Sequence, residues 1–320
     1  SYGTENVEGK EQAPSRFLAE IESALTVRDM ASYGSSDTVL DALKPLLHES
    51  VTTSFMLDVI EKRGISPTAL NNFIKSPWEF LYKNVLRAPQ VKSTELQYGS
   101  AIHYVLDQMI LNHDNSDTFI SSELKIALSK EALSDDEFAR LHARGLASLV
   151  VYRDTFLKSV TSESKTEVKL EGEIETGIDE FPTLKLTGTL DRVDSLNGEI
   201  IRVVDYKTGK PKTRNHIEGK TADSAGEYKR QLVFYALLLS LQADKEKHCR
   251  VGMLSFVESE KNGEIKEETF TITDEEIATL KDELLTMIRT IVSGEALNIE
   301  CDPKVCNYCE LVEKIQKKRP

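Results

Sequence analysis

The stretch VVDYKTGKPK, Val203 to Lys212, places two charged residues, Asp205 and Lys207, inside an apolar run that ends at Thr208-Gly209. Its β-branched content predicts a strand. Alternate residues of a strand share a face, so the two charged side chains point to one side while their apolar neighbours point to the other. A charged pair on one face of an apolar strand must be hydrated, paired or bound to a ligand.

A second acid lies on the preceding predicted strand, as Asp191 in the sequence GTLDRVD. Asn197-Gly198, between the two strands, is a typical hairpin turn. Asp191 and Asp205 each lie seven positions from Gly198. This symmetry predicts that the two acids face each other across the hairpin with their carboxylates a few ångströms apart.

Two facing carboxylates destabilise a sheet unless a cation lies between them. Their hard oxygen atoms suit Mg²⁺ or Mn²⁺. Lys207 could stabilise an anionic transition state or help to orient or deprotonate a water. Two acids with a cation and a nearby lysine are the groups that metal-assisted phosphodiester hydrolysis uses. The alternative is a surface hairpin with ordinary solvated charges, and the spacing alone leaves both open.

The composition is that of a globular protein, with 320 residues, 40% hydrophobic and 29% charged. A net charge of −13 argues against binding a polyanion by overall attraction. However, the segment from Arg202 to Lys220 contains six Lys or Arg residues against two acidic ones. The segment is therefore either a solvated face or a local site for phosphates.

No transmembrane helix is predicted, because the longest apolar run, Leu232 to Leu241, is about half of the roughly 20 residues that a span needs. The first residues, SYGTENVEGKEQAPS, lack the apolar core of a secretory signal and begin with serine, as a trimmed fragment would. We therefore expect a cytoplasmic protein.

Hydrophobic periodicity predicts helices up to about residue 160. Ser66 is a candidate N-cap with Pro67 at the first helical position, Pro77 marks a second break, and YGSAIHYVLDQMIL is a further helix. The polar stretch from Ser121 to about Val160 predicts two more.

The pattern then changes to strands. KTEVKLEGEIET, LKLTGTLDRVDSLN and EIIRVVDYKTG predict a three-stranded meander, and EYKRQLVFYALLLSLQ predicts a helix that is apolar on nearly all sides. Two strands follow, and then a helix with capping-box spacing between Thr273 and Glu276 and with Gly294 at its end. This order predicts an α/β fold.

The pattern GTLDRVD…VVDYKTGK…QLVFY resembles the PD-(D/E)xK nucleases of the RecB/AddB type, which include CRISPR-associated RecB-like exonucleases. The resemblance covers roughly residues 65 to 310. It implies a restriction-endonuclease-like core, a mixed central sheet flanked by helices, in a nuclease domain over residues 65–320. A helical insertion is expected at about residues 114–160.

The resemblance implies roles for individual residues. Asp191 and Asp205 match the two metal-binding acids of the family, and Lys207 matches its catalytic lysine. His103, in YGSAIH, matches a helical histidine that contacts the metal, and the peptide carbonyl of Tyr206 completes the metal shell by the same analogy. Alone, one histidine on a helix is more often packed or exposed than a ligand.

Gln231 and Tyr235 match the family's QxxxY element. They lie one helical turn apart, which suits contacts to the catalytic lysine or to the DNA backbone. The alternative is that Tyr235 belongs to the core. The basic residues after the strand are implied phosphate contacts, so the positive charge of this acidic protein would be local: Lys210, Lys212 and Arg214.

The resemblance fails at the iron–sulfur cluster that relatives often hold with one upstream and three downstream cysteines. Ser76, in KSPWEF, occupies the place of the upstream cysteine, and the last downstream ligand would fall near Ile315. Cys306 and Cys309 match a CxxC pair, and Cys249 and Cys301 are the remaining cysteines. We therefore expect that the cluster is lost, with an iron–sulfur exonuclease as the alternative.

The segment APSRFLAEI resembles a PSRFL segment near the end of the motor in UvrD-like helicases. The resemblance implies that residues 1–64 are a helical linker or the tail of a preceding helicase region. As part of a helicase–nuclease, this chain would bind DNA and act in end resection during double-strand-break repair. No Walker A motif occurs in the sequence. The rival hypothesis is a scaffold or DNA-binding module that has lost the chemistry.

Overall fold

The computed structural model describes residues 49–88, 90, 92–196, 200–242, 248–260, 262–299, 306 and 308. The chain divides into two compact units, Ser1–His48 and Glu49–Pro320, and all described residues belong to the second. The predictions for residues 1–48, including the PSRFL segment, lie outside the described residues, as do the Asn197-Gly198 turn, Cys301 and Cys309.

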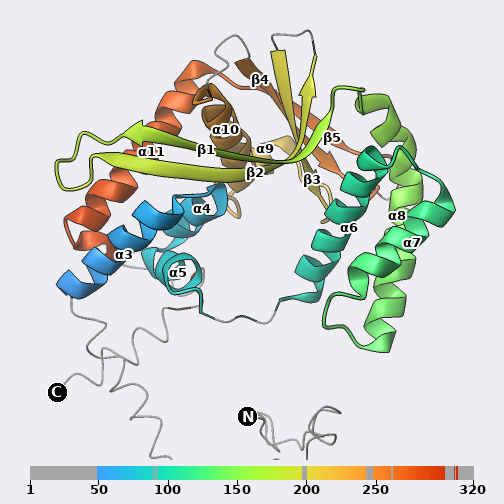
Figure 1. The fold of residues 1–320 in the computed structure, drawn as a ribbon, viewed down its shortest axis with the longest axis horizontal. Coiled ribbons are helices and arrows are strands. Elements are labelled where there is room, and N and C mark those ends of the chain that lie inside the picture. Colours follow the sequence, from blue (N-terminus) through green and yellow to red (C-terminus); the bar gives the residue numbers. More distant parts are fainter. Residues whose placement is uncertain are drawn as a thin grey trace, which may run out of the picture. The chain divides into compact units, whose positions relative to one another are not determined.

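Five strands form one mixed sheet in the order β1-β2-β3-β4-β5 (Figure 1). The pairs β1–β2, β2–β3 and β4–β5 are antiparallel, and β3–β4 is parallel. The three-stranded meander is confirmed, and a helix connects the parallel strands, as such a crossover requires. The strands are β1 Lys165–Glu175, β2 Thr183–Ser195, β3 Ile200–Lys207, β4 His248–Phe256 and β5 Glu267–Thr271.

Helix α10, Glu227–Ser240, packs on one face of the sheet, as its nearly continuous apolar sequence predicts. Two glycines allow this close approach. A Cβ atom on Gly252 of β4 would lie 3.1 Å from Leu232, and one on Gly188 of β2 would lie 2.7 Å from Leu238. Helices α11 Asp274–Val292 and α4 Pro67–Lys75 pack against α10, while α3 Glu49–Arg63 contacts β2 and α11.

Three helices cover the opposite face: α6 Thr94–Leu111, α7 Asp117–Leu128 and α8 Asp135–Ser159. Their core continues into the sheet through Val204, Tyr206 and Met253. Helix α7 begins at Asp117, four residues before the predicted stretch, because Ser116 caps it by accepting a hydrogen bond from the backbone N–H of Phe119.

The predicted caps are present. The Ser66 side chain accepts from Ala69 N at the start of α4, and Thr273 and Glu276 form the capping box of α11. Four short segments complete the fold: α5 Pro77–Phe80, the π-helical turn η4 Leu81–Val85, α9 Arg214–Ile217 and the 3₁₀ turn η5 Glu295–Asn298. None of the helices in the described part of the chain has both the length and the apolar content that a bilayer crossing needs.

Candidate active site

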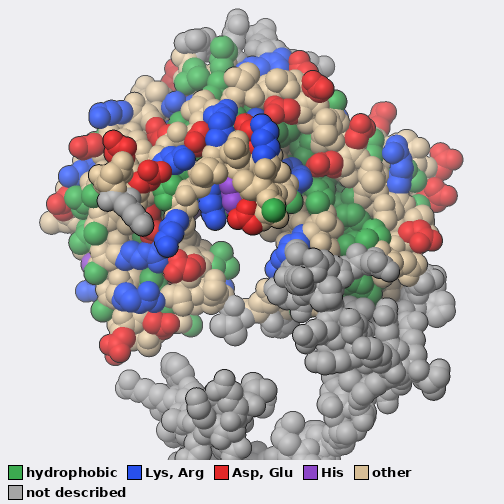
Figure 2. Space-filling view, turned by 180° about the vertical axis from the view of Figure 1, so that it is seen from behind, with side chains coloured by type: hydrophobic (Ala, Val, Ile, Leu, Met, Phe, Trp, Pro, Cys, Tyr) green, Lys and Arg blue, Asp and Glu red, His purple; other side chains and the backbone are tan. Residues whose placement is uncertain are grey.

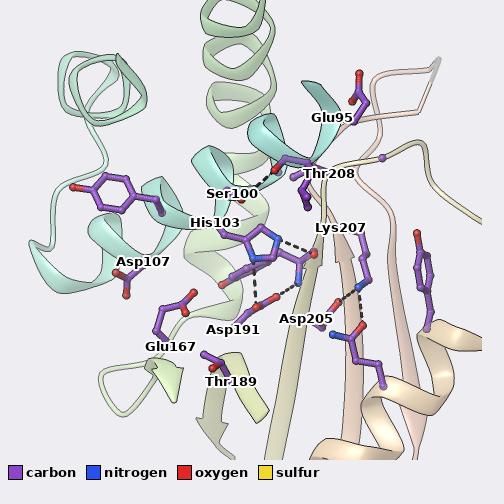
Figure 3. Close-up of a pocket in the computed structure, with 17 residues that line it drawn as sticks. Glu95, Ser100, His103, Asp107, Glu167, Thr189, Asp191, Asp205, Lys207 and Thr208 are labelled. Carbon is purple, nitrogen blue, oxygen red and sulfur yellow. Dashed lines mark hydrogen bonds and ion pairs between the residues drawn. The ribbon is translucent and has the colours of Figure 1, made fainter. Parts of the chain in front are cut away.

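The two acids of the hairpin lie on adjacent strands at one cavity, as the sequence predicts. The register Arg192↔Val204 sets Asp191 across from Asp205. Both residues line a cavity of about 720 Å³ between β2, β3, α6 and the start of α10 (Figure 3). The other residues of its lining include Glu95, Leu96, Gly99, Ser100, His103, Tyr104, Asp107, Glu167, Thr189, Tyr206, Lys207, Thr208, Gly209, Tyr228 and Gln231.

Asp205 is nearly fully buried, with 1% of its surface exposed. Burial, together with the negative charge of Asp191, raises the pKa of the Asp205 carboxyl, although Lys207 acts in the opposite sense. A buried carboxylate beside a second carboxylate is costly unless cations compensate it. Lys207 supplies one positive charge, with its Nζ 2.7 Å from Asp205 Oδ2.

His103 reaches the acids from α6 and contacts both strands. Its Nε2 lies 3.1 Å from the carbonyl oxygen of Tyr206, and its Nδ1 lies 3.3 Å from Asp191 Oδ1. The same peptide of Tyr206 donates its N–H to Asp191 Oδ2 at 2.9 Å. The structure thus brings together the four predicted metal-binding residues around the end of β3.

The geometry at His103 fits a cation. If Nε2 donates to the Tyr206 carbonyl, Nδ1 and Asp191 Oδ1 are two acceptors that face each other, so a proton or a shared cation must lie between them. Although burial disfavours the imidazolium, the Asp191 and Asp205 carboxylates raise the pKa of His103 above 6.5. Carboxylate oxygens, a peptide carbonyl and one imidazole form a donor set that suits Mn²⁺ or Mg²⁺.

Gln231 and Tyr235 form a chain of hydrogen bonds that ends at Lys207. Lys207 Nζ donates to Gln231 Oε1 at 2.9 Å, and Gln231 Nε2 donates to the Tyr235 hydroxyl at 2.7 Å. Although burial opposes its charge, Asp205 raises the pKa of Lys207, which therefore stays an ammonium. The Lys207 ammonium also lies 4.6 Å from the centre of the Tyr228 ring. Tyr235 is buried, so it is both a core residue and a partner of this chain.

Glu167 also lies at the site, although no sequence motif indicates it. An oxygen of Glu167, an oxygen of Asp191 and a nitrogen of His103 lie within 4.8 Å of one another. Burial and the Asp191 charge raise the pKa of Glu167. Its backbone has a φ of 48°, a strained value for a non-glycine residue. Glu167 could be found only from its position opposite Asp191, and this position follows from the β1–β2 register, which the sequence does not specify.

The three basic residues after Gly209 do not line the described cavity. Of the loop after β3, Thr208 and Gly209 belong to the lining. Lys210 is exposed. Arg214 folds back on β5, where it pairs with Glu268 at 3.1 Å and lies 4.2 Å from the centre of the Phe270 ring. In the space-filling view from behind, acidic and basic side chains mix over the surface, and several basic ones lie along the rim of a central hollow (Figure 2).

The described cysteines are both buried. Cys249 is the second residue of β4, and burial raises the pKa of its thiol to about 12, which disfavours the thiolate that ligates metals. Near Cys306, Tyr308 stacks on Tyr82 with ring centres 4.7 Å apart, and Tyr82 in turn stacks on Trp78. This aromatic stack connects α5 and η4 to the C-terminal segment.

Comparison with known proteins gives a family match. The family model of the PD-(D/E)XK nuclease superfamily matches residues 64–313. No curated protein matches the chain. A solved structure described as a "putative exonuclease" from Eubacterium rectale is 15% identical, covers 87% of this chain and 92% of its own, and has a TM-score of 0.45. LHK-Exo in complex with dAMP is 15% identical, with 62% and 91% covered and a TM-score of 0.26.

Proposed function

The chain belongs to the PD-(D/E)XK nuclease superfamily and has its restriction-endonuclease-like fold, and on that premise we propose that it is a divalent-metal-dependent deoxyribonuclease. The observation that carries the proposal is the meeting of Asp191, Asp205, His103 and Lys207 at one cavity. A surface hairpin with solvated charges would not bury Asp205.

Asp191, Asp205, His103 and the carbonyl of Tyr206 would hold Mg²⁺ or Mn²⁺. When bound, such an ion polarises a phosphoryl oxygen and lowers the pKa of a coordinated water. Hydrolysis of a phosphodiester builds negative charge on the phosphoryl oxygens, and the Lys207 ammonium at the cavity wall is placed to stabilise that charge. Gln231 holds Lys207 toward the cavity by accepting its hydrogen bond, and Tyr235 holds Gln231.

The DNA strand would enter along the rim of the cavity and continue over the loop after Gly209. Lys210 is exposed there and Lys212 partly so, which leaves their ammonium groups accessible to phosphates. Arg214 would contact a phosphate only by leaving Glu268. All three residues are proposed phosphate contacts, and Arg214 would contribute least because it must first break its ion pair with Glu268.

The biological setting is a further part of the proposal. The resemblance of GTLDRVD and VVDYKTGK to the RecB/AddB type supports a role in DNA end resection and double-strand-break repair. In that setting residues 1–64 would be the tail of a helicase region and residues 65–320 the nuclease domain. A helicase, in the same longer chain or in a partner subunit, would feed DNA to the cavity.

The test is cleavage of labelled single-stranded DNA with Mn²⁺ by the parent chain and by Asp205→Ala and Lys207→Ala. We expect cleavage by the parent, its loss on adding EDTA, and its loss in both variants. Glu173→Gln is the matched control, because Glu173 is an exposed carboxylate of β1 that lies outside the cavity lining. A parent as inactive as the variants would favour the scaffold hypothesis.

The same preparation tests the iron–sulfur alternative. A brown protein that contains iron would support a cluster in which Cys249 or Cys301 replaces a missing ligand. A colourless, iron-free protein that cleaves DNA would support the proposal that the cluster is lost.

A further inference from the structure

A buried polar network lies next to the candidate metal site, on the face of β3 that α6 and α8 cover and opposite to the side chains of Asp205 and Lys207. Arg192, the residue after Asp191, has none of its surface exposed. Its Nε lies 3.0 Å from Asp194 Oδ1, its Nη2 donates to Ser159 Oγ at 3.0 Å, and its Nη1 donates to the Tyr206 hydroxyl at 2.9 Å. These three partners of Arg192 are supplied by β2, α8 and β3.

Two arginines, Arg192 and Arg202, share the carboxylate of Asp194, and Arg202 is partly exposed. Asp194 is also fully buried, and it accepts hydrogen bonds from Arg202 at 2.7 Å and from Ser164 at 2.6 Å. The desolvation of buried ion pairs largely cancels their attraction, so such pairs contribute little net stability. Buried polar groups with every partner satisfied do fix geometry. The network is therefore better explained by the geometry that it fixes than by a contribution to the free energy of unfolding.

Tyr206 connects this network to the site. Its hydroxyl accepts a hydrogen bond from Arg192, its peptide N–H donates to Asp191, and its carbonyl accepts from His103. Its ring also lies edge-on to the His103 ring, with centres 5.9 Å apart. One residue thus touches two candidate metal ligands and a fixed guanidinium.

We propose that Arg192 is a positioning residue, which holds the Tyr206 side chain so that the Tyr206 peptide keeps Asp191 and His103 in register for a divalent cation. This inference rests on the metal site of the proposed function. Residues that orient ligands from outside the coordination shell affect metal affinity by about 10- to 100-fold. Loss of the link should therefore change metal affinity as well as stability.

The experiment is titration of the full chain with Mn²⁺ by isothermal calorimetry, well below the melting temperature. Tyr206→Phe removes one hydroxyl and keeps the ring and the peptide. We expect its dissociation constant for Mn²⁺ to rise about 10-fold. Tyr152→Phe is the matched control, because Tyr152 is buried in the same aromatic cluster but bonds through its hydroxyl to Ser255. We expect its Mn²⁺ affinity to stay within about 2-fold of the parent.

Arg192→Lys provides a second arm, because lysine keeps the positive charge beside Asp194 but lacks the fork that reaches Tyr206. In that background Tyr206→Phe should cause little further loss of Mn²⁺ affinity, since the two changes remove one interaction. Additive losses would contradict the link between the two residues.

The possible failures are distinguishable. If Tyr206→Phe binds Mn²⁺ as the parent does, while both Tyr→Phe variants melt at lower temperature, the network is only structural and this inference is wrong. If the parent binds no Mn²⁺, the metal site of the proposed function and this inference are both overturned.

Discussion

Lys207 forms an ion pair with Asp205 two residues earlier on β3, with Nζ and Oδ2 2.7 Å apart. The strand period places both side chains on one face, where Asp205 is buried and Lys207 is partly exposed at the cavity. In the absence of a metal, the ammonium compensates the carboxylate. Lys207 and a bound cation would therefore both contact Asp205. A variant of Lys207 can for this reason have different effects on metal binding and on DNA cleavage.

Lys207→Met should separate these roles. Removal of the ammonium frees Asp205 for a cation, so Mn²⁺ affinity should stay equal or increase. Cleavage should fall by about 10² to 10³, because one preorganised group that stabilises the developing charge is lost. Calorimetry and single-turnover cleavage measure the two effects, with Lys158→Met, an exposed residue of α8, as the control. Loss of both binding and cleavage would contradict a catalytic role for the ammonium.

His103 should make the stability of the metal-free protein depend on pH. The neighbouring carboxylates raise the pKa of His103 above 6.5. A raised pKa means that the stability contributed by the imidazolium is fully present below the unfolded value and is lost as pH rises through the folded value. In EDTA, the parent should therefore exceed His103→Gln in melting temperature most at about pH 6 and least well above neutrality.

Bound Mn²⁺ should have the opposite pH dependence. Metal binding needs the neutral imidazole, so the stabilisation of the parent by Mn²⁺ should grow as pH rises through the same window. A difference in melting temperature between parent and His103→Gln that stays constant with pH would show that the histidine does not titrate there.

Gly64→Ala should destabilise the junction between α3 and the sheet. Gly64 has a φ of 72°, and an added Cβ would lie 2.9 Å from Thr187 Cγ2 and 3.0 Å from the backbone oxygen of Lys185. Gly177 shares the left-handed backbone, with a φ of 67°, but has no neighbour within 4 Å, so Gly177→Ala is the matched control. We expect the control to lose about 1–2 kcal/mol of unfolding free energy and Gly64→Ala about 1–3 kcal/mol more. Equal losses in urea titrations would exclude the packing contribution.

The local sequence was sufficient to predict β2, β3 and the acid pair. Asn197-Gly198 indicates a short hairpin, and its symmetry sets Asp191 opposite Asp205 once the turn is assumed. The apolar sequence of α10 likewise predicts burial of the whole helix. Both arguments use patterns that can be read from residues close together in the sequence.

The rest of the site depends on contacts that the sequence does not specify. Glu167 reaches Asp191 only through the β1–β2 register, and the two strands are connected by residues 176–182, which have no single strong turn signal. The contact of Arg192 with Tyr206 depends in addition on the packing of α8 behind the sheet. The alternative of a surface hairpin with solvated charges is wrong at Arg192, because this residue is fully buried.

Glu167→Gln should weaken metal binding without loss of stability. Although Glu167 is exposed, desolvation at the cavity and the neighbouring Asp191 raise the pKa of Glu167 and so disfavour its charged carboxylate. The neutral amide relieves this repulsion, so the melting temperature in EDTA at neutral pH should be equal to or above that of the parent. The dissociation constant for Mn²⁺ should rise about 10-fold, because an oxygen ligand or its orienting partner is lost. Glu173→Gln, on the same strand but outside the cavity lining, should leave both quantities unchanged. Unchanged Mn²⁺ affinity in Glu167→Gln would show that Glu167 does not take part in the metal site and that its strained backbone has another cause.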